Sequence, residues 1–533
     1  MKSTLLTNIF NEEYLLPFWL QHHKDMFDDI VIVDYNSTDK SVEICRQICP
    51  CARIITTRNK WFAAEGIDKE FMDLESSIEG IKVVLNTTEF LFTTRPVNAT
   101  FAGVTKPVSY SMTVYSPYSK NRYDIHNHYT LCHGLLHQDV VYHCDRWTRQ
   151  IHTFPHGNYT IGRHNTRNPI TPTNEMYVIW MGYYPLNDSL LSRKLQIQSK
   201  IPQVDKDRGF GSQHLFTLEK MLSINSEKVE SGVPLATLNP KLHALLSSRF
   251  AAKTFVVTGG CGFIGSHMVD RLISLGHKVV IIDNVTSGHI ENANTNAILE
   301  RVDICEYESL KSAIARHGPI DGLFHFAAIA RTPWCIDDPL LCYRTNVTGT
   351  LNVLEVSRQL SIKRVVLSSS NVVYAYFTPY RTSKEALEGL AKAYTEMYGL
   401  SVISLRYSNV YGKRQSEIGP SPNVFAALRK SKKETGKLVL TGDGTQTRNY
   451  THVSDIVSGN LLSMFSSHCG VIDLCTGVPV ALNDAARYFD CPIEYIPDRP
   501  GDVKHILQSP TEAFSILGWK ALITLDEGIQ DVL

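Results

Sequence analysis

The sequence predicts an α/β protein of two domains, the second of which contains a parallel sheet covered by helices on both faces. Three observations favour this class. A glycine-rich turn, Thr258–Gly265, joins the β-branched run Thr254–Val257 to a helix-like segment. Strand-like and helix-like segments alternate through the rest of the second half, as in doubly wound sheets. Near the N-terminus another apolar strand ends in Asp34 and runs into the polar helix cap Asn36–Ser41.

Composition and charge exclude several classes of protein. The chain has 533 residues, 43% of them hydrophobic and 20% charged, with a formal net charge of zero. A neutral chain gives no reason to expect nucleic acid or an anionic membrane surface as a partner. No apolar run reaches the length of a membrane span, and the N-terminus lacks a signal-peptide cleavage region. The twelve cysteines show no disulfide or zinc spacing, which favours a reducing, cytoplasmic location.

The two domains are expected to meet near residue 245. The stretch Ser223–Ala252 reads as a connector, and the segment Pro240–Ser247 is helix-like. We therefore expect a first domain over residues 1–240, a linker over 241–252 and a second domain over 253–533.

The glycine-rich turn indicates a dinucleotide site. Glycines let a strand turn sharply and let the backbone approach a pyrophosphate, which the amides of the next helix then face. The apolar run Lys278–Ile282 ends in Asp283, whose carboxylate can bind adenosine ribose hydroxyls and repel a 2′-phosphate. The predicted cofactor is therefore NAD. The turn and this strand end supply the candidate cofactor-binding residues Gly259, Gly262, Phe263, Ile264, Gly265, Asp283 and Asn284.

Later strand ends extend this site, because ligands bind at the carboxyl edge of such sheets. Asp303 and Ile304 are expected near adenine, and the small Ala327 and Ala328 allow a cofactor to approach a strand end. Further cofactor-binding candidates are Asn346, at the start of a helix, and Ser368, in the hydroxyl-rich end of the run Val365–Ser370.

Tyr380 and Lys384 are the candidate catalytic pair. Four residues apart on a helix, they share one face. A nearby ammonium, together with an oxidised nicotinamide, lowers the pKa of a phenol so that it can act as a base.

From residue 253 to 533 the chain closely resembles the extended short-chain dehydrogenase family, specifically its nucleotide-sugar epimerases and dehydratases. The resemblance also includes Leu405–Gly412, Gly442–Val453 and Arg499–Val503. It implies a Rossmann-type domain with a small C-terminal substrate-binding subdomain, and a homodimer. It also implies that Asn409, Arg448 and Arg499 hold the nucleoside diphosphate of a sugar nucleotide, for which guanidinium groups are suited.

Within this family the sequence is most similar to UDP-hexose 4-epimerases. Dehydratases and decarboxylases carry carboxylates just after the hydroxyl-rich strand end, and residues 370–375 contain none. The resemblance implies that Tyr380 takes the 4-hydroxyl proton with Ser370 sharing that hydrogen bond, while Lys384 orients the nicotinamide ribose. One departure is the short segment between Ser370 and Tyr380, which must alter the wall of the sugar pocket.

The first domain resembles inverting family-two-like glycosyltransferases of the GT-A fold. Asn11 and Glu12 follow the strand-like Ser3–Ile9, and Asp34 ends the next strand. The resemblance implies that Asp34 contacts uridine and that Asn11 and Glu12 lie beside a UDP-sugar donor, from which the sugar passes to a glycan or other acceptor.

The metal motif of such transferases is degraded here. Where an Asp-x-Asp is usual, the stretch Val83–Leu91 keeps Glu89 as its one acid. One carboxylate is a poor Mg²⁺ or Mn²⁺ site without a second ligand, for which His164 is the candidate.

Three readings of the whole chain are open. The first is a bifunctional enzyme that epimerises a UDP-hexose and transfers a sugar. The second is an epimerase fused to a non-catalytic module that binds sugar nucleotide or glycan. The third has a dehydratase or reductase in place of the epimerase, against which the acid-free residues 370–375 and Asp283 argue.

Overall fold

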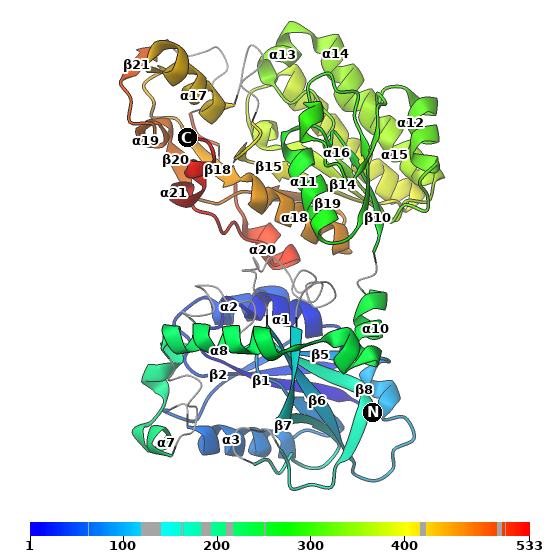
Figure 1. Ribbon diagram of the computed structural model, residues 1–533, viewed down its shortest axis with the longest axis vertical. Coiled ribbons are helices and arrows are strands. Elements are labelled where there is room, and N and C mark those ends of the chain that lie inside the picture. Colours follow the sequence, from blue (N-terminus) through cyan, green and yellow to red (C-terminus); the bar gives the residue numbers. More distant parts are fainter. Residues whose placement is uncertain are drawn as a thin grey trace. The chain divides into compact units, whose positions relative to one another are not determined.

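The computed structural model describes residues 1–533 except 62, 119–139, 161–162, 164, 183–192, 194, 209–216, 250–251, 416–422, 498–503 and 507. The chain divides into two compact units, Met1–Ala251 and Ala252–Leu533, each drawn in Figure 1. The predicted linker region is partly helical, since it overlaps α10 (Pro240–Arg249). None of the helices within the described residues is long and apolar enough to cross a membrane.

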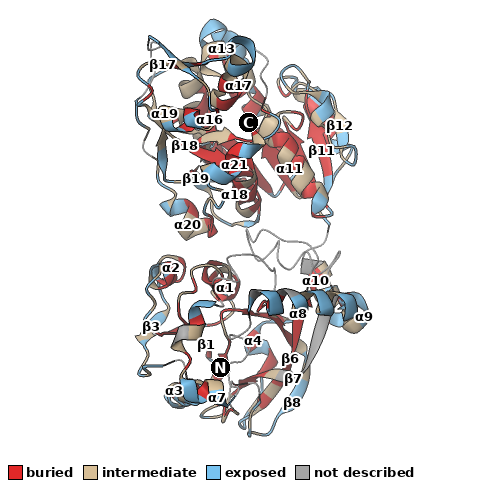
Figure 2. Cartoon of the chain, turned by 60° about the vertical axis from the view of Figure 1, so that its left-hand side comes forward, coloured by how far each residue is buried: buried red, intermediate tan, exposed pale blue. Residues whose placement is uncertain are grey.

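The first unit is built on one mixed sheet of order β3-β2-β1-β4-β7-β6-β8-β5, with β9 paired to β7. Strands β1 to β4 run parallel, so that Leu5 lies opposite both Ile30 and Val83. Figures 1 and 2 both show α1 and α2 on one face of the sheet and α3 on the other. The strands are β1 (Ser3–Ile9), β2 (Asp29–Asp34), β3 (Arg53–Thr56), β4 (Ile81–Val84), β5 (Glu89–Thr93), β6 (Ser109–Tyr118), β7 (Val140–His152), β8 (Thr171–Trp180) and β9 (Val233–Pro234).

Apolar side chains from both layers close the core of this unit. Leu6, Val31 and Val84 of the strands pack against Ile67 and Phe71 of α3. The helices are α1 (Leu16–His23), α2 (Ser41–Ile48), α3 (Ala64–Ser76), α4 (Val97–Thr100), η2 (Gln198–Lys200), α7 (Gln203–Asp207), α8 (Leu218–Ser231), α9 (Leu235–Leu238) and α10.

The second unit contains a parallel sheet of order β12-β11-β10-β13-β14-β15-β19, which confirms the predicted doubly wound α/β fold. The strand order reverses between β10 and β13, where Val256 lies opposite both Val280 and Leu323. Ligands of open α/β sheets bind at such a reversal. The strands are β10 (Thr254–Thr258), β11 (Lys278–Ile282), β12 (Ile298–Glu300), β13 (Gly322–His325), β14 (Arg364–Ser370), β15 (Ser401–Tyr407) and β19 (Gly470–Leu474).

Helices cover both faces of this sheet: α11 packs with α18, and α12 packs with α15, which in turn packs with α16. Figure 2 shows the buried strands between these helices, whose outer sides are exposed. The helices are η4 (Ile290–Asn292), α11 (Phe263–Ser274), α12 (Tyr307–Ala315), α13 (Thr332–Asp337), α14 (Pro339–Tyr343), η5 (Arg344–Thr348), α15 (Gly349–Gln359), η6 (Asn371–Tyr374), α16 (Pro379–Tyr398), α18 (Val453–Phe465) and α20 (Thr511–Leu517).

A smaller subdomain has its own core, in which Tyr411, Phe425 and Tyr450 pack together. It contains the three-stranded sheet β16-β18-β20 and the pair β17-β21. Its elements are β16 (Asn409–Tyr411), α17 (Val424–Thr435), β17 (Leu438–Thr441), β18 (Thr447–His452), β20 (Pro479–Ala481), α19 (Leu482–Arg487), β21 (Ile493–Ile496), α21 (Leu525–Gly528) and η7 (Ile529–Asp531).

Candidate functional site

A cavity of about 620 Å³ opens at the carboxyl ends of β10, β11, β13 and β14, next to the reversal of strand order. It is lined by every predicted cofactor-binding residue except Asn346, and also by Ser370 and Asn409. The sheet therefore gathers side chains that are far apart in the sequence into one site, as the edge argument predicts.

The glycine turn is packed so closely against the neighbouring backbone that it leaves no room for side chains at two positions. Gly259 has a φ of +71°, and a Cβ there would lie 2.6 Å from the amide nitrogen of Ala327. A Cβ on Gly265 would lie 2.2 Å from the carbonyl oxygen of Gly259. The N-terminus of α11 receives no side-chain cap from Gly262, so its first amides remain available to an anion such as a pyrophosphate.

Asp283 joins this turn to the end of β11. Its carboxylate is buried and accepts hydrogen bonds from the amides of Cys261 (2.9 Å) and Val285 (2.8 Å). These contacts fix the carboxylate at the cavity wall with acceptor capacity left for ribose hydroxyls.

Asn346 is not among the residues that line the cavity, and its part in cofactor binding stays a prediction. Its Oδ1 accepts from the amide of Ile329 (2.8 Å), and its Nδ2 donates to Ser383 Oγ (3.0 Å). The side chain is buried because it ties the loop after β13 to α16. Asn346 therefore shapes the cavity from behind.

Tyr380 and Lys384 enter the cavity from the first turns of α16, beside the end of β14. Lys384 Nζ donates to the carbonyl oxygen of Ser368 at 2.7 Å and lies 5.9 Å from the centre of the Tyr380 ring. Burial lowers the pKa of Lys384 to about 8. Burial also raises the pKa of Tyr380 to about 12, opposed by a hydrogen bond with Ser370 and by the charge of Arg331.

The raised pKa of Tyr380 differs from the sequence-based expectation, in which Lys384 and an oxidised nicotinamide together lower it. Without a bound cofactor, the loss of hydration on burial has the largest effect on the pKa of Tyr380. The pairing of Tyr380 with Ser370 and the placement of Lys384 on the same side of the cavity are as expected.

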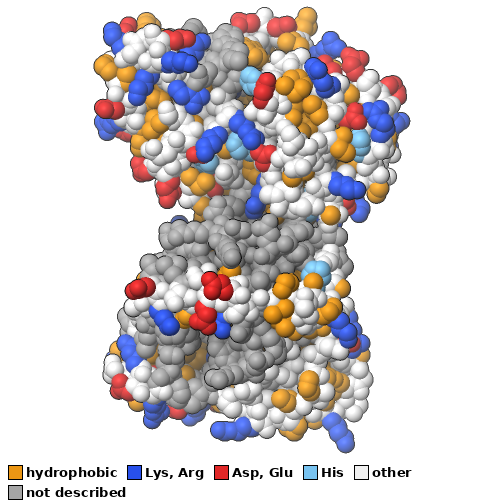
Figure 3. Space-filling view, viewed as in Figure 1, with side chains coloured by type: hydrophobic (Ala, Val, Ile, Leu, Met, Phe, Trp, Pro, Cys, Tyr) orange, Lys and Arg blue, Asp and Glu red, His pale blue; other side chains and the backbone are white. Residues whose placement is uncertain are grey.

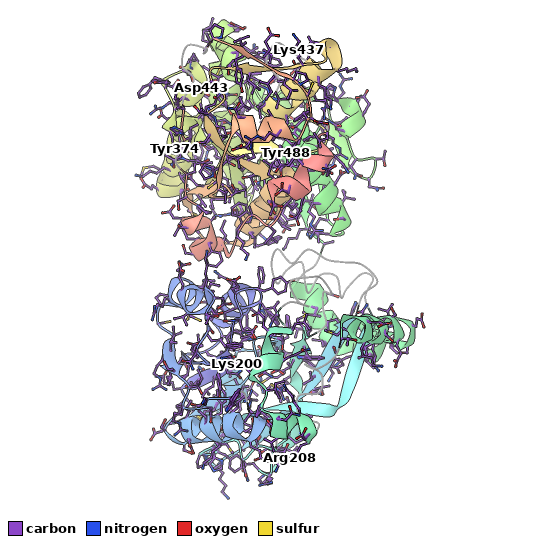
Figure 4. All side chains as sticks on the ribbon, turned by 90° about the vertical axis from the view of Figure 1, so that its left-hand side faces the viewer. Lys200, Arg208, Tyr374, Lys437, Asp443 and Tyr488 are labelled. Atoms are coloured by element: carbon purple, nitrogen blue, oxygen red, sulfur yellow. The ribbon has the colours of Figure 1, made fainter. Side chains whose placement is uncertain are left out.

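The short segment after Ser370 forms the turn η6 and leads directly to the N-cap of α16, Thr378. Tyr374, labelled in Figure 4, bonds Asp473 through its hydroxyl (3.1 Å) and accepts from Arg406 (2.7 Å). Tyr376 is 61% exposed and does not line the cavity. The shortened wall therefore leaves Tyr380 as the tyrosine of this segment that faces the site.

Two lining groups were missed by the sequence analysis. Arg331 follows the small residues at the end of β13, and Asn423 precedes α17 of the subdomain. Arg331 Nη1 donates to Asn423 Oδ1 at 2.5 Å. The position of Arg331 just beyond a strand end was a usable signal, whereas Asn423 comes from a different part of the fold.

A buried histidine under the cavity was also missed. His325, at the end of β13, bonds Thr258 Oγ1 (2.7 Å) and Thr350 Oγ1 (2.9 Å). Burial lowers its pKa to about 3. It is therefore a neutral cross-link between β10 and α15, and not an acid or base of the site.

The predicted diphosphate ligands are only partly brought together. Asn409 lines the cavity, but Arg448 does not, and its Nη1 donates to the carbonyl oxygen of Thr447 at 2.8 Å. Arg499 lies outside the described residues.

In the first unit, Asn11, Glu12 and Asp34 lie at the carboxyl ends of β1 and β2. Asn11 Oδ1 accepts from the amide of Thr38 (2.8 Å), and Asp34 Oδ1 accepts from that of Ser37 (3.0 Å). Both carboxylate oxygens of the buried Glu12 accept from Arg193, at 2.5 and 2.6 Å.

The structure gives no support to the expected metal site at Glu89. Both of its oxygens accept from Arg149, at 2.8 and 2.5 Å, and Oε2 also takes the amide of Asn86. Glu89 and Arg149 are each 3% exposed through their side chains, so the carboxylate is neutralised inside the core. Among the described residues no cluster of His, Cys, Asp or Glu could hold a metal ion. His164 lies outside these residues.

A third arginine, Arg163, reaches the same strand ends. Its Nη2 donates to Asn8 (3.1 Å) and Asn86 (2.8 Å), and its Nη1 to Asp68 (3.3 Å). Guanidinium groups thus occupy the region where the sequence suggested a cation-binding carboxylate.

The second unit is a dinucleotide-binding α/β domain with a tyrosine–lysine pair beside the cofactor cavity. Residues 255–469 match the model of the NAD dependent epimerase/dehydratase family. Over 299 residues the chain is 33% identical to a protein of Methanocaldococcus jannaschii with a provisional assignment as a UDP-glucose 4-epimerase, a match that covers 52% of this chain and 96% of that one.

Two further proteins that match the same part of the chain are named UDP-glucose 4-epimerases. The UDP-glucose 4-epimerase of Lacticaseibacillus casei is 31% identical over 303 residues, covering 50% of this chain and 91% of its own. The crystal structure of Thermotoga maritima UDP-glucose 4-epimerase with UDP-glucose is 32% identical, with a TM-score of 0.50, over 52% of this chain and 97% of that one.

The chain therefore belongs to the NAD dependent epimerase/dehydratase family through its second unit. The family match lies within that unit, so the glycosyltransferase resemblance of residues 1–240 stays a prediction.

Proposed function

We propose that the second unit, predicted as residues 253–533, interconverts the 4-epimers of a UDP-hexose with bound NAD. The observation that carries the proposal is the meeting of Tyr380, Ser370 and Lys384 with the glycine turn in one cavity. The acid-free turn η6 favours epimerisation over dehydration, which needs further proton-transfer groups. The similarity to UDP-glucose 4-epimerases supports the choice of UDP-sugar.

The site fits NAD. A Cβ at Gly259 or Gly265 would collide with the protein's own backbone, so the tight turn that presents the uncapped start of α11 to a pyrophosphate needs glycine at both positions. Asp283 would bind the adenosine ribose, Asp303 and Ile304 the adenine side, and Lys384 the nicotinamide ribose. A 2′-phosphate would meet the Asp283 carboxylate, which favours NAD over NADP.

The chain's own residues would handle the proton. Bound NAD supplies reversible hydride acceptance at C4. Tyr380 takes the 4-hydroxyl proton and returns it, Ser370 shares that hydrogen bond, and Lys384 keeps a positive charge on the same side. Asn409, Arg448 and Arg499 remain the proposed ligands of the UDP diphosphate.

Purified full-length chain should convert UDP-glucose to UDP-galactose without added cofactor, because NAD is regenerated in every cycle. Product sugars are separated by chromatography, and the nucleotide released on denaturation is identified by mass spectrometry. Release of NADP, or no conversion of UDP-glucose, UDP-galactose or their N-acetyl forms, would contradict the proposal.

We also propose a homodimer formed through the second unit. Apolar side chains are exposed along neighbouring helices: Leu340 of α14 is 82% exposed, Leu351 of α15 39% and Met397 of α16 73%. On the face of this unit that Figure 3 draws, hydrophobic, basic and acidic side chains are interspersed. Light scattering on the same preparation should give twice the chain mass of 60.0 kDa; a monomer at micromolar concentration would rule the dimer out.

For the first unit we propose a nucleotide-sugar site that transfers its sugar to an acceptor without a metal ion at Glu89. The order β1, Asn11 and Glu12, β2, Asp34 supports it. Because Arg149 neutralises Glu89, a cation other than a metal ion would have to balance the charge of a leaving diphosphate. Arg163 reaches the same strand ends and would have to exchange its partner Asp68 for that diphosphate. The rival proposal is a non-catalytic module that binds the same ligand.

Calorimetry of the full chain with UDP tests whether the first unit binds a nucleotide at all, as both the transferase and the non-catalytic module require. The Tyr380→Phe variant is titrated beside Asp34→Asn, and two binding events per chain are expected, one of which Asp34→Asn weakens. The heat should not depend on Mn²⁺. A single UDP-binding event in both variants would contradict a nucleotide site in the first unit. Two binding events without sugar transfer to any acceptor tried would favour the non-catalytic module.

A further inference from the structure

Arg331 stands out among the residues that line the cavity. It directly precedes α13, after the loop that leaves β13, and it is half-buried. Its Nη1 donates to Asn423 Oδ1 (2.5 Å) and to the carbonyl oxygen of Ala330 (3.3 Å). These are neutral acceptors, so they orient the guanidinium without cancelling its charge.

The charge of Arg331 has no carboxylate partner among the residues that the structure describes. Burial lowers its pKa, and Tyr380 is the group whose charge opposes that effect. Arg414, which also lines the cavity, is by contrast paired with Asp270 at 2.7 Å. A half-buried guanidinium that faces a cavity without a counter-ion is a site for an anionic ligand group.

The position of Arg331 near Tyr380 indicates which part of the ligand carries the anionic group. Arg331 directly precedes α13, which packs against α16, the helix that carries Tyr380, and both side chains line the cavity. In the proposed function, Tyr380 contacts the 4-hydroxyl of the sugar. The diphosphate is attached at C1, across the ring from C4, whereas C6 is attached to C5, the neighbour of C4. An anionic group beside Tyr380 is therefore one carried on C6.

We propose that Arg331 binds the C6 carboxylate of a UDP-hexuronate, and that UDP-hexuronates are the preferred substrates of this site. The inference rests on the proposed epimerase function. A guanidinium presents two parallel N–H groups to a carboxylate, a geometry that lysine does not reproduce. Asn423 holds the guanidinium by its Nη1, which leaves the other nitrogens for the ligand.

The test compares kcat/KM for UDP-glucuronate and UDP-glucose in the wild type, Arg331→Met and Arg331→Lys. Arg487→Met is the control, because Arg487 is 78% exposed through its side chain and pairs with Asp484 on the surface. The wild type should prefer the uronate by about 10- to 100-fold, the effect of a charged hydrogen-bonded pair. The ratio should fall towards one in Arg331→Met, fall less in Arg331→Lys, and stay at the wild-type value in the control.

Calorimetry with UDP, UDP-glucose and UDP-glucuronate separates the sources of an anion. Equal weakening of all three ligands in Arg331→Met would assign the guanidinium to the diphosphate and overturn the inference. A wild type that epimerises UDP-glucose and discriminates against UDP-glucuronate would also overturn it, with the epimerase intact. If neither sugar nucleotide is epimerised, the proposed epimerase function is wrong. In that case tighter binding of UDP-glucuronate than of UDP-glucose, lost in Arg331→Met, would still support the carboxylate site, whereas equal binding of the two would contradict it as well.

Discussion

Replacing Tyr380 by Phe is expected to lower kcat for epimerisation by about 10²- to 10⁴-fold, the usual contribution of a positioned acid–base group. The change removes one hydroxyl whose hydrogen-bond partner is Ser370, and the ring remains to pack in α16. The fold and the NAD content should therefore be retained. Conversion of UDP-glucose and the absorbance of the released nucleotide measure the two effects separately.

Tyr376→Phe is the matched control for that variant. Tyr376 belongs to the same shortened segment but is 61% exposed and lies outside the cavity wall. Its variant should keep wild-type kcat. If Tyr380→Phe retains more than about a tenth of wild-type activity, or if Tyr376→Phe loses it, the base lies elsewhere.

Replacing Glu89 by Gln should destabilise the first unit by about 3–5 kcal/mol, because it leaves Arg149 buried without its counter-ion. Urea titration of the full chain, with hydrogen exchange of peptides from residues 1–118, reports this unit separately. Glu175→Gln is the control: Glu175 pairs with Arg95 on the surface, where a salt bridge contributes only about 0–1 kcal/mol.

The double variant Glu89→Leu with Arg149→Met should regain most of the lost stability, since an apolar pair leaves no buried charge. A metal ligand would behave differently: its loss would cost metal-dependent activity and little stability. If Glu89→Gln is as stable as the wild type, the buried pair does not exist as described.

Local spacing determined much of the second unit. The turn Thr258–Gly265, Asp283 at the end of the next strand, and Tyr380 four residues before Lys384 each need only neighbouring residues and a regular element to be recognised. The parallel sheet then brings these strand ends to one edge, whatever the loops between them do. The cofactor cavity and the family were therefore predictable from the chain alone.

The surroundings of Asn346 could not be predicted from the sequence, because its hydrogen-bond partners lie in other segments. Only the packing of η5 against α16 and the loop after β13 brings the carboxamide to Ser383 and Ile329. For the same reason a helix start does not by itself reveal whether its side chain faces a ligand or the core.

What only the tertiary structure decided is the partner of each buried charge. Glu89 and Arg149 are 60 residues apart, and Glu12 and Arg193 are 181 apart. Neither pair can be inferred from the pattern of neighbouring residues, and the sequence therefore suggested Glu89 as a metal ligand. For Arg331 the sequence gives its position beyond a strand end, but only the structure shows that it lines the cavity without a carboxylate partner among the described residues. Charge compensation is a property of three-dimensional neighbours, whereas turns, caps and helix faces are properties of consecutive residues.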